Sequence, residues 1–300
     1  MVDPHIATLI DLPQAPPSVE DSEALCKRLA LSHYENFTVV SRLVPRRMRQ
    51  PLYDLYALCR TVDDIGDEAP GDRVFLLDRF ENELAAAYEG TPHHPVLVAL
   101  KGTIERFDMP RDLFLRQITA NRIDQETNRY QTVREFGRYC EHSATPVGRL
   151  FLILFGYQDD ELFALSDSTC IALQLTNFWQ DVKRDYEQGR IYLPLDEIKE
   201  YDVSEADLSA ARANDQFKSL MRFQVDRARR YFRDGLPLID RVHGSLRVDI
   251  ALFSRGGLAI LDKIEQLHYD TLTARPTLTK SEKIWLFLST LISSRWRKWI

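Results

Sequence analysis

The chain has 300 residues, 44% of them hydrophobic, which is enough to bury a large core in a single all-α domain. Its formal net charge of -6 at pH 7 argues against a nucleic-acid partner. Glycine is scarce at 12 residues, and no repeat or Gly/Ser-rich stretch indicates a linker. We therefore expect an N-terminal arm over residues 1–20 and one domain over residues 21–300.

The N-terminal arm contains four prolines and is expected to be loosely held. It shows no basic segment followed by an apolar run, so no signal peptide is evident. The cysteines form no CxxC pair and are typical of buried free thiols in a reducing compartment; they are Cys26, Cys59, Cys140 and Cys170. We expect a cytoplasmic protein.

The first informative stretch is the acidic run DDIGDE, residues 63–68, which follows a mostly apolar segment with helical spacing. Positions i and i+4 share one helix face, so Asp63 and Asp67 can reach toward one site. Like charges placed in this way repel unless they are solvated, paired with cations or bound to a divalent ion. Arg60, one turn earlier, would pair with these carboxylates or present its fork to phosphate, and the two roles are compatible.

A second acidic pair, Asp181 and Asp185, follows a similar apolar stretch more than a hundred residues later. Gln174 and Asn177 precede it at helical spacing, so the four side chains form one stripe. The two amides would orient water or diphosphate, or be satisfied by the backbone. Acidic residues four apart are often just solvated, but the apolar context of both runs favours a magnesium and diphosphate site.

Three sequence blocks resemble the squalene/phytoene synthase family, the head-to-head trans-isoprenyl diphosphate synthases. They are LVPRRMRQPLYDLYALCRTVDDIGDE (residues 43–68), YCEHSATPVGRL (139–150) and LTNFWQDVKRDYEQGRIYLP (175–194). Four short sequence segments look most like those of the bacterial hydroxysqualene synthases of squalene and hopanoid biosynthesis. These are HYENF (33–37), SATPVG (143–148), FWQDV (178–182) and ALFSRGGLAILDKIE (251–265).

The resemblance implies an all-α isoprenoid synthase bundle around a central cavity, with Mg²⁺ held by four aspartates. The metal ligands would be Asp63, Asp67, Asp181 and Asp185, supported by Asp64 and Glu68. Asn177 and Tyr139 would join them in catalysis. Substrate contacts would come from Arg60, Tyr56, Phe37, Gln174, Tyr192 and Asp124, although Asp124 could instead cap a helix.

A carbocation formed after diphosphate leaves needs an apolar cavity with aromatic faces that excludes water. Candidate walls are Phe37, Tyr56, Phe151, Phe155, Phe178 and Trp179. Each ring could equally be plain core. Where many relatives carry a tyrosine, this chain has Gly257, which we expect to leave room for a water molecule.

The activity implied by the resemblance is the conversion of presqualene diphosphate to hydroxysqualene with Mg²⁺ and without NADPH. Within the family, the alternative is a squalene, presqualene diphosphate or phytoene-type synthase that joins two prenyl diphosphates. From another class, the chain could be a non-catalytic relative that serves assembly or binding. Such proteins typically lose aspartates, whereas the four principal aspartates, Arg60 and Asn177 are all present here.

The C-terminal segment combines an apolar run at residues 284–292, too short to span a bilayer, with RWRKW at 295–299. Aromatic and basic residues together suit peripheral contact with a membrane interface. The alternative, which we favour, is a last core helix whose basic end complements the helix dipole.

Overall fold

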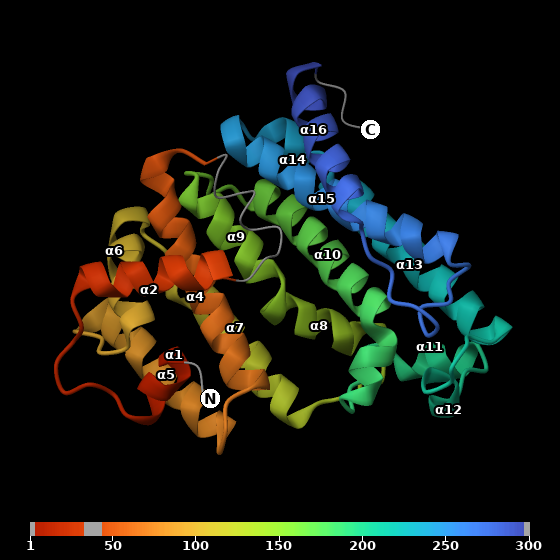
Figure 1. Ribbon diagram of the computed structural model, residues 1–300, viewed down its shortest axis with the longest axis horizontal. Helices are drawn as coiled ribbons and strands as arrows, with labels where there is room; N and C mark the ends of the chain where they lie inside the picture. The colour runs from red at the N-terminus through yellow and green to blue at the C-terminus, as the bar shows by residue number, and fades with distance from the viewer. Residues whose placement is uncertain (1–3, 33–43, 297–300) are drawn as a thin grey trace. The chain divides into compact units, whose positions relative to one another are not determined.

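The computed structural model describes residues 4–32 and 44–296 (Figure 1). Over this part of the chain the secondary structure is helical, with one isolated parallel bridge between Arg129 and Ile191. The all-α prediction is confirmed. The chain divides into two compact units, residues 1–126 with 149–158 and residues 127–148 with 159–300. The expectation of one domain over residues 21–300 stays a prediction.

The first unit is built around α4, which packs on the other long helices of this unit. Its apolar residues, such as Leu52, Leu58 and Ile65, are buried, which satisfies the helical periodicity of the sequence. The helices of this unit are α1 (Pro4–Ile10), α2 (Val19–Ser32), α4 (Arg46–Asp67), α5 (Arg73–Glu89), α6 (Pro95–Phe107) and α7 (Arg111–Glu126). The unit boundary falls within α9 (Thr145–Leu154).

Part of the expected N-terminal arm is helical and packed. Helix α1 contacts α4 and α5, with Ile6 and Leu9 buried. Arg79 of α5 donates a hydrogen bond to the Ile10 carbonyl at 3.0 Å, which satisfies a group at the helix end. Pro4 occupies the first position of the helix, where a missing amide is tolerated. The expectation of a loosely held segment, which was based on proline content, is therefore wrong for residues 4–10.

The C-terminal end of α4, which carries the acidic run, is fixed by Arg73. Its guanidinium donates to the carbonyls of Gly66 (3.0 Å) and Asp67 (2.8 Å), and its Nε donates to that of Ala69 (3.1 Å). The last carbonyls of a helix have no partner within the helix, and a cation there also complements the helix dipole. Arg73 thus holds the backbone of the acidic run in place.

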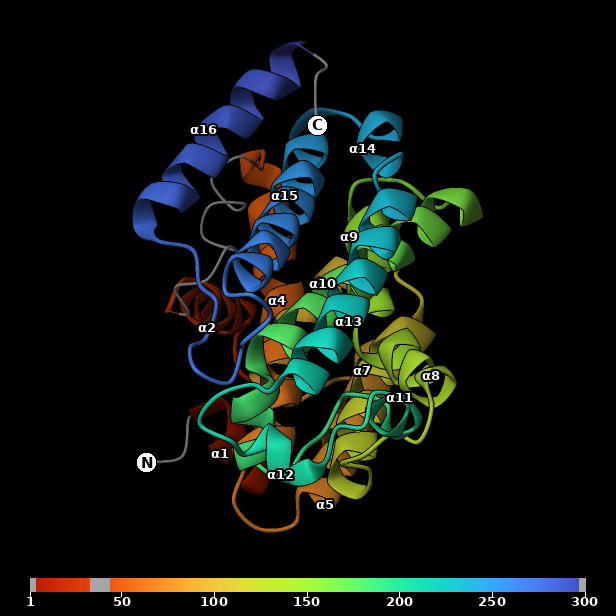
Figure 2. The ribbon, with the colours of Figure 1, turned by 90° about the vertical axis from the view of Figure 1, so that its right-hand side faces the viewer.

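The second unit is centred on α10, which packs on α13 and α15, and the two views show these three long helices side by side (Figures 1 and 2). Helix α10 begins after Asp159, whose carboxylate accepts from the amides of Glu161 and Leu162. The helices of this unit are α8 (Val133–Ser143), α10 (Asp160–Glu187), α11 (Leu195–Glu200), α12 (Glu205–Leu208), α13 (Asp215–Gly235), α14 (Leu238–Arg241), α15 (Gly244–Gln266) and α16 (Lys280–Trp296).

Gly257 on α15 marks a close approach of helices rather than free space. A Cβ atom at this position would lie 2.3 Å from Cζ of Phe232 and 3.1 Å from a methyl carbon of Leu173. The expectation that Gly257 leaves room for a water molecule is therefore wrong, because these two side chains already fill the space where a larger residue would begin. The glycine allows α10, α13 and α15 to pack closely.

Helix α16 lies along α15, and its two faces differ. Its inner face is held by Arg255, which donates to Thr290 (2.9 Å) and Ser289 (3.0 Å). Its outer face leaves large apolar residues exposed, namely Ile284, Trp285, Leu288 and Ile292. The favoured expectation of a core helix thus holds for one face only, because nothing in the described residues covers the other. Within the same residues, no helix is long and apolar enough to cross a bilayer.

The four cysteines are free thiols, as expected. Cys26 and Cys140 are buried, while Cys59 and Cys170 are half-buried. Burial raises the pKa of each thiol above its ordinary value. These thiols are therefore protonated and unreactive at neutral pH.

Candidate functional site

The acidic run at the end of α4 separates into exposed and buried carboxylates. Asp63 and Asp67 are exposed to solvent, whereas Asp64 is buried. Arg60 lies 2.5 Å from the Asp64 carboxylate and 3.5 Å from that of Glu68. The ion-pairing role expected for Arg60 is therefore present, and it is directed at the buried aspartate rather than at Asp63. A phosphate-binding role for Arg60 stays a prediction.

Asp63 is held by a neutral amide from α7. The side-chain nitrogen of Asn121 donates to Oδ1 of Asp63 at 3.3 Å. Although part of Asp63 is exposed to solvent, the protein around its carboxyl group desolvates it, and together with the negative charge of Asp67 this raises the pKa of Asp63 to about 7, against the opposing effects of Asn121 and Arg60. A carboxylate in this situation gains stability from any cation that reaches it.

In the second unit, Asp181 on α10 is paired with an arginine from the loop between α15 and α16. Arg275 donates from Nε and one terminal nitrogen to the two oxygens of Asp181, at 2.6 and 2.8 Å. This is the bidentate geometry that suits a carboxylate. The next residue, Pro276, accepts a hydrogen bond through its carbonyl from Gln180 of α10, which ties the same loop to the helix.

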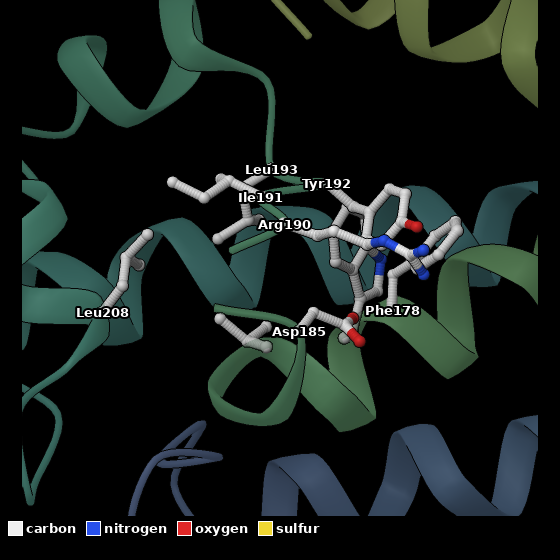
Figure 3. Close-up of a pocket in the computed structure, with 9 residues that line it drawn as sticks. Phe178, Asp185, Arg190, Ile191, Tyr192, Leu193 and Leu208 are labelled. Carbon is white, nitrogen blue, oxygen red and sulfur yellow. The ribbon is translucent and has the colours of Figure 1, made fainter. Parts of the chain in front are cut away.

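Asp185, one turn after Asp181, lies at the edge of a pocket within this unit (Figure 3). Burial and the charge of Asp181 raise the pKa of Asp185 to about 7, against the effect of nearby arginines such as Arg190. The pocket is lined by Phe178, Trp179, Val182, Asp185, Arg190, Ile191, Tyr192, Leu193 and Leu208. Carboxylate, guanidinium and aromatic rings thus meet in one concave surface.

Aromatic rings form a continuous cluster beside Asp185. Phe178 and Tyr192 stack with their ring centroids 3.8 Å apart, and Tyr139 lies 6.0 Å from Tyr192. Tyr130 and Phe136 extend the cluster, at 5.5 Å from Tyr139 and 5.5 Å from Phe178 respectively. The structure therefore brings Tyr139 of the block at residues 139–150 together with Phe178 and Tyr192 of the block at residues 175–194.

The remaining expected site residues are placed as follows. Gln174 is half-buried and Asn177 exposed, both on α10 with the aspartates. Tyr56 and Asp124 are half-buried on α4 and α7. The rings of Phe151 and Phe155 form an edge-to-face pair with each other. Phe37 lies outside the described residues. The two acidic rows belong to different units, and their convergence on one diphosphate stays a prediction.

Two residues of the site were not expected from the sequence. Asn121 lies three residues before Asp124, and only its helical register relative to α4 reveals that it reaches Asp63. Arg275 lies in the loop LTARPTLT, residues 272–279, which has no helical periodicity to indicate a direction. No local pattern could have identified either contact, because each joins segments at least 58 residues apart in the chain.

The carboxylates of both rows fit a divalent metal chemically. Hard cations such as Mg²⁺ prefer oxygen ligands, and each row has two carboxylates whose mutual repulsion a cation would relieve. Over the described residues, no three His, Cys, Asp or Glu side chains are already gathered in one cluster. Each row alone therefore offers part of a ligand set, which phosphate oxygens would complete.

The chain is similar to known proteins over most of its length. The model of the family "Squalene/phytoene synthase" matches residues 31–282. A phytoene synthase from Arthrospira platensis is 32% identical over 281 residues, covering 87% of this chain and 90% of the relative. The solved structure of squalene synthase HpnC from Alicyclobacillus acidocaldarius is 42% identical, with a TM-score of 0.81 over 88% of this chain and 98% of that one.

A solved dehydrosqualene synthase, 23% identical, shares the fold with a TM-score of 0.85 over 92% of this chain and 98% of that one. These likenesses confirm the family resemblance carried by the three sequence blocks.

Proposed function

Because the chain belongs to the squalene/phytoene synthase family, we propose that it converts presqualene diphosphate to hydroxysqualene. The observation that carries this proposal is the pocket in which Asp185 lies beside the stacked rings of Phe178 and Tyr192. A carboxylate that would hold Mg²⁺ for the diphosphate, next to an aromatic wall, is what ionisation of a prenyl diphosphate requires.

In the proposed reaction, the bond between carbon and the diphosphate oxygen breaks, and its electron pair leaves with diphosphate. Mg²⁺ held by Asp63, Asp67, Asp181 and Asp185 would neutralise the charge that develops on the leaving group. The cation rearranges, one water oxygen bonds to carbon, and that water loses a proton. These steps involve no net reduction, so NADPH is not required.

The aromatic cluster supports the second half of this reaction. The negative face of an aromatic ring stabilises a nearby cation without donating a proton or a nucleophile. Phe178 and Tyr192 are both buried, so these rings also limit the access of bulk water. A cation held there would survive long enough to rearrange before a single water molecule captures it.

The squalene branch of the family is favoured over phytoene synthesis by two observations. The chain is 42% identical to the squalene synthase HpnC, compared with 32% and 30% to phytoene synthases from Arthrospira platensis and Synechocystis. The local blocks at residues 33–37 and 251–265 point the same way. A synthase that joins two prenyl diphosphates is the alternative, and its product would differ.

Product analysis by mass spectrometry tests the proposal. The purified protein with Mg²⁺ receives presqualene diphosphate or farnesyl diphosphate, each with and without NADPH. We expect hydroxysqualene from presqualene diphosphate alone. A product that forms only from farnesyl diphosphate, or only with NADPH, would assign the chain to a coupling or reducing synthase. No turnover of any of these substrates would favour a non-catalytic role.

We further propose that the outer face of α16 contacts an anionic membrane surface peripherally. Ile284, Leu288 and Ile292 follow one another at intervals of four residues, and the neighbouring Trp285 is 69% exposed. Lys280 and Lys283 are exposed at the start of the helix. The single acidic residue of α16, Glu282, is paired with Lys263 at 2.5 Å. An apolar row flanked by lysines suits anionic lipid headgroups, and it suits an enzyme with a lipid product.

Co-sedimentation with phosphatidylglycerol-containing vesicles tests this surface. We expect the wild-type protein to bind and the Trp285→Glu/Leu288→Glu double variant to bind about tenfold less. Phe75→Glu, which changes another exposed aromatic residue, on α5, is the matched control and should bind as wild type. Equal binding of the α16 variant would refute the proposal, and so would a wild-type protein that stays in the supernatant. A dimer in vesicle-free solution that this variant abolishes would assign the face to a second copy.

A further inference from the structure

Asn121 is oriented by both hydrogens of its side-chain amide. It is 8% exposed, and its nitrogen donates to Oδ1 of Asp63 and to the carbonyl of Gln117, both at 3.3 Å. Only the nitrogen end can face Asp63 favourably, because the amide oxygen and the carboxylate are both acceptors. The amide oxygen must then point elsewhere.

The amide oxygen of Asn121 is directed at Gly66. A Cβ atom on Gly66 would lie 2.2 Å from this oxygen and 3.0 Å from the amide carbon. Gly66 lies inside α4 with ordinary helical backbone, so its conformation does not require glycine. Glycine in a helix interior costs roughly 1 kcal/mol relative to alanine. The absence of a side chain at Gly66 therefore leaves the space that the Asn121 amide occupies.

A neutral amide is suited to hold a carboxylate that must also bind a metal ion. It fixes one oxygen and favours the ionised form, yet it brings no positive charge that would compete with the metal. Its hydrogen bond is to Oδ1, and among the described residues no hydrogen bond is seen to the second carboxylate oxygen of Asp63, which leaves that oxygen for a metal ion. The buried neighbour Asp64 is instead held by a cation, Arg60.

We propose that Asn121 is a positioning residue that orients Asp63 for divalent-metal binding, and that Gly66 is glycine in order to admit it. This inference rests on the proposed function, since it takes Asp63 to be a metal ligand. It assigns a role to Gly66, the glycine of the DDIGDE run, and to an amide from another helix. Gly66 and Asn121 depend on each other, because a larger residue 66 would displace the amide from Asp63 and a shorter residue 121 would not reach it.

The first experiment measures Mn²⁺ affinity by electron paramagnetic resonance in the presence of inorganic diphosphate. We expect Asn121→Leu to weaken Mn²⁺ binding about tenfold. The matched control is Gln125→Leu. Gln125 lies one turn later on α7 and donates to the Gly66 carbonyl at 3.0 Å, but its amide is hydrogen-bonded only to main-chain carbonyls in the described residues. This control should bind Mn²⁺ within about twofold of wild type.

A double variant separates positioning from folding. Gly66→Ala alone should lower the thermal midpoint and weaken Mn²⁺ binding, because the new methyl group displaces Asn121. Adding Asn121→Ala should restore the thermal midpoint, since the clash disappears, while Mn²⁺ affinity stays about tenfold low. This split between stability and metal affinity is not expected of a merely structural contact.

Two outcomes would overturn the inference while leaving the proposed function intact. One is wild-type Mn²⁺ affinity in both Asn121 variants, and the other is an equal loss in Asn121→Leu and Gln125→Leu. A wild-type protein that binds no Mn²⁺ with diphosphate would instead contradict the proposed function itself. The two failures are therefore distinguishable in one titration series.

Discussion

The two acidic rows share a sequence pattern, yet the structure holds them in different ways. On α4, the leading aspartate, Asp63, accepts from the neutral amide of Asn121. On α10, the corresponding Asp181 is clasped by the guanidinium of Arg275 through two hydrogen bonds. An amide leaves a carboxylate open to a cation, whereas an arginine already supplies one.

If both rows bind metal as we propose, this difference predicts that they do so by different routes. Asp63 can accept a divalent ion without losing its partner. Asp181 can accept one fully only as Arg275 withdraws, and a guanidinium released beside bound diphosphate would then face an anion. The loop that carries Arg275 is attached to α10 through Pro276 and Gln180, so the arginine stays close after release.

The largest expected effect comes from removing either leading carboxylate. Asp63→Asn and Asp181→Asn should each lower kcat about 100-fold or more, because the charge on departing diphosphate is then poorly neutralised. Steady-state kinetics with Mg²⁺ measure this, and circular dichroism checks that the helices are intact. Asp226→Asn, an exposed aspartate on α13, is the control and should be unchanged. Near-normal turnover in either row variant would contradict a metal role for that row.

Asp249 differs from both Asp63 and Asp181, because its carboxyl group has neither an amide nor a guanidinium partner in the described residues. Asp249 on α15 is fully buried, and neither of its oxygens has a hydrogen-bond partner in the described residues. Burial raises the pKa of Asp249 to about 8 from an ordinary value of 3.8. The folded protein therefore holds this proton where the unfolded chain has lost it, so stability falls as pH rises from about 4 to about 8.

Asp249→Asn removes this pH dependence. The free energy of unfolding of wild type, relative to the variant, should fall by about 2 kcal/mol or more between pH 5 and pH 8. Urea unfolding at both pH values measures the difference. A constant difference across this range would show that the Asp249 carboxyl is ionised and satisfied in the folded protein.

A smaller effect, on Mn²⁺ affinity, is expected when the ion pair between Arg275 and Asp181 is removed. Arg275→Gln should make Mn²⁺ bind about 3- to 10-fold more tightly in the absence of diphosphate, because the competing cation is gone. Arg241→Gln is the matched control, since Arg241 makes a comparable bidentate ion pair with Glu161 in the first turn of α10, whereas Asp181 lies near the other end of that helix. Unchanged Mn²⁺ affinity in Arg275→Gln would refute the distinction drawn between the two rows.

Apolar periodicity in the sequence predicted the helical fold, and the resemblance of three blocks predicted the family; both are confirmed. A metal-binding role for the aspartates of the two rows stays a prediction. Apolar periodicity around Asp63 and Asp181 is a property of single helices. The contacts of Asn121 and Arg275 depend on how distant segments pack, which periodicity does not contain. Gly257 shows the same limit: its small size was predicted to make room, whereas tertiary packing places Phe232 there.

The proposed capture of the carbocation by water is tested most directly by running the reaction with presqualene diphosphate in H₂¹⁸O and measuring the mass of the alcohol product by mass spectrometry. Ionisation followed by water capture predicts that the hydroxyl oxygen carries ¹⁸O, since the original carbon–oxygen bond is broken. An alcohol that retains ¹⁶O would show that water attacks phosphorus instead, and a hydrocarbon without oxygen would show that the cation loses a proton or gains a hydride. Either result would contradict the proposed function.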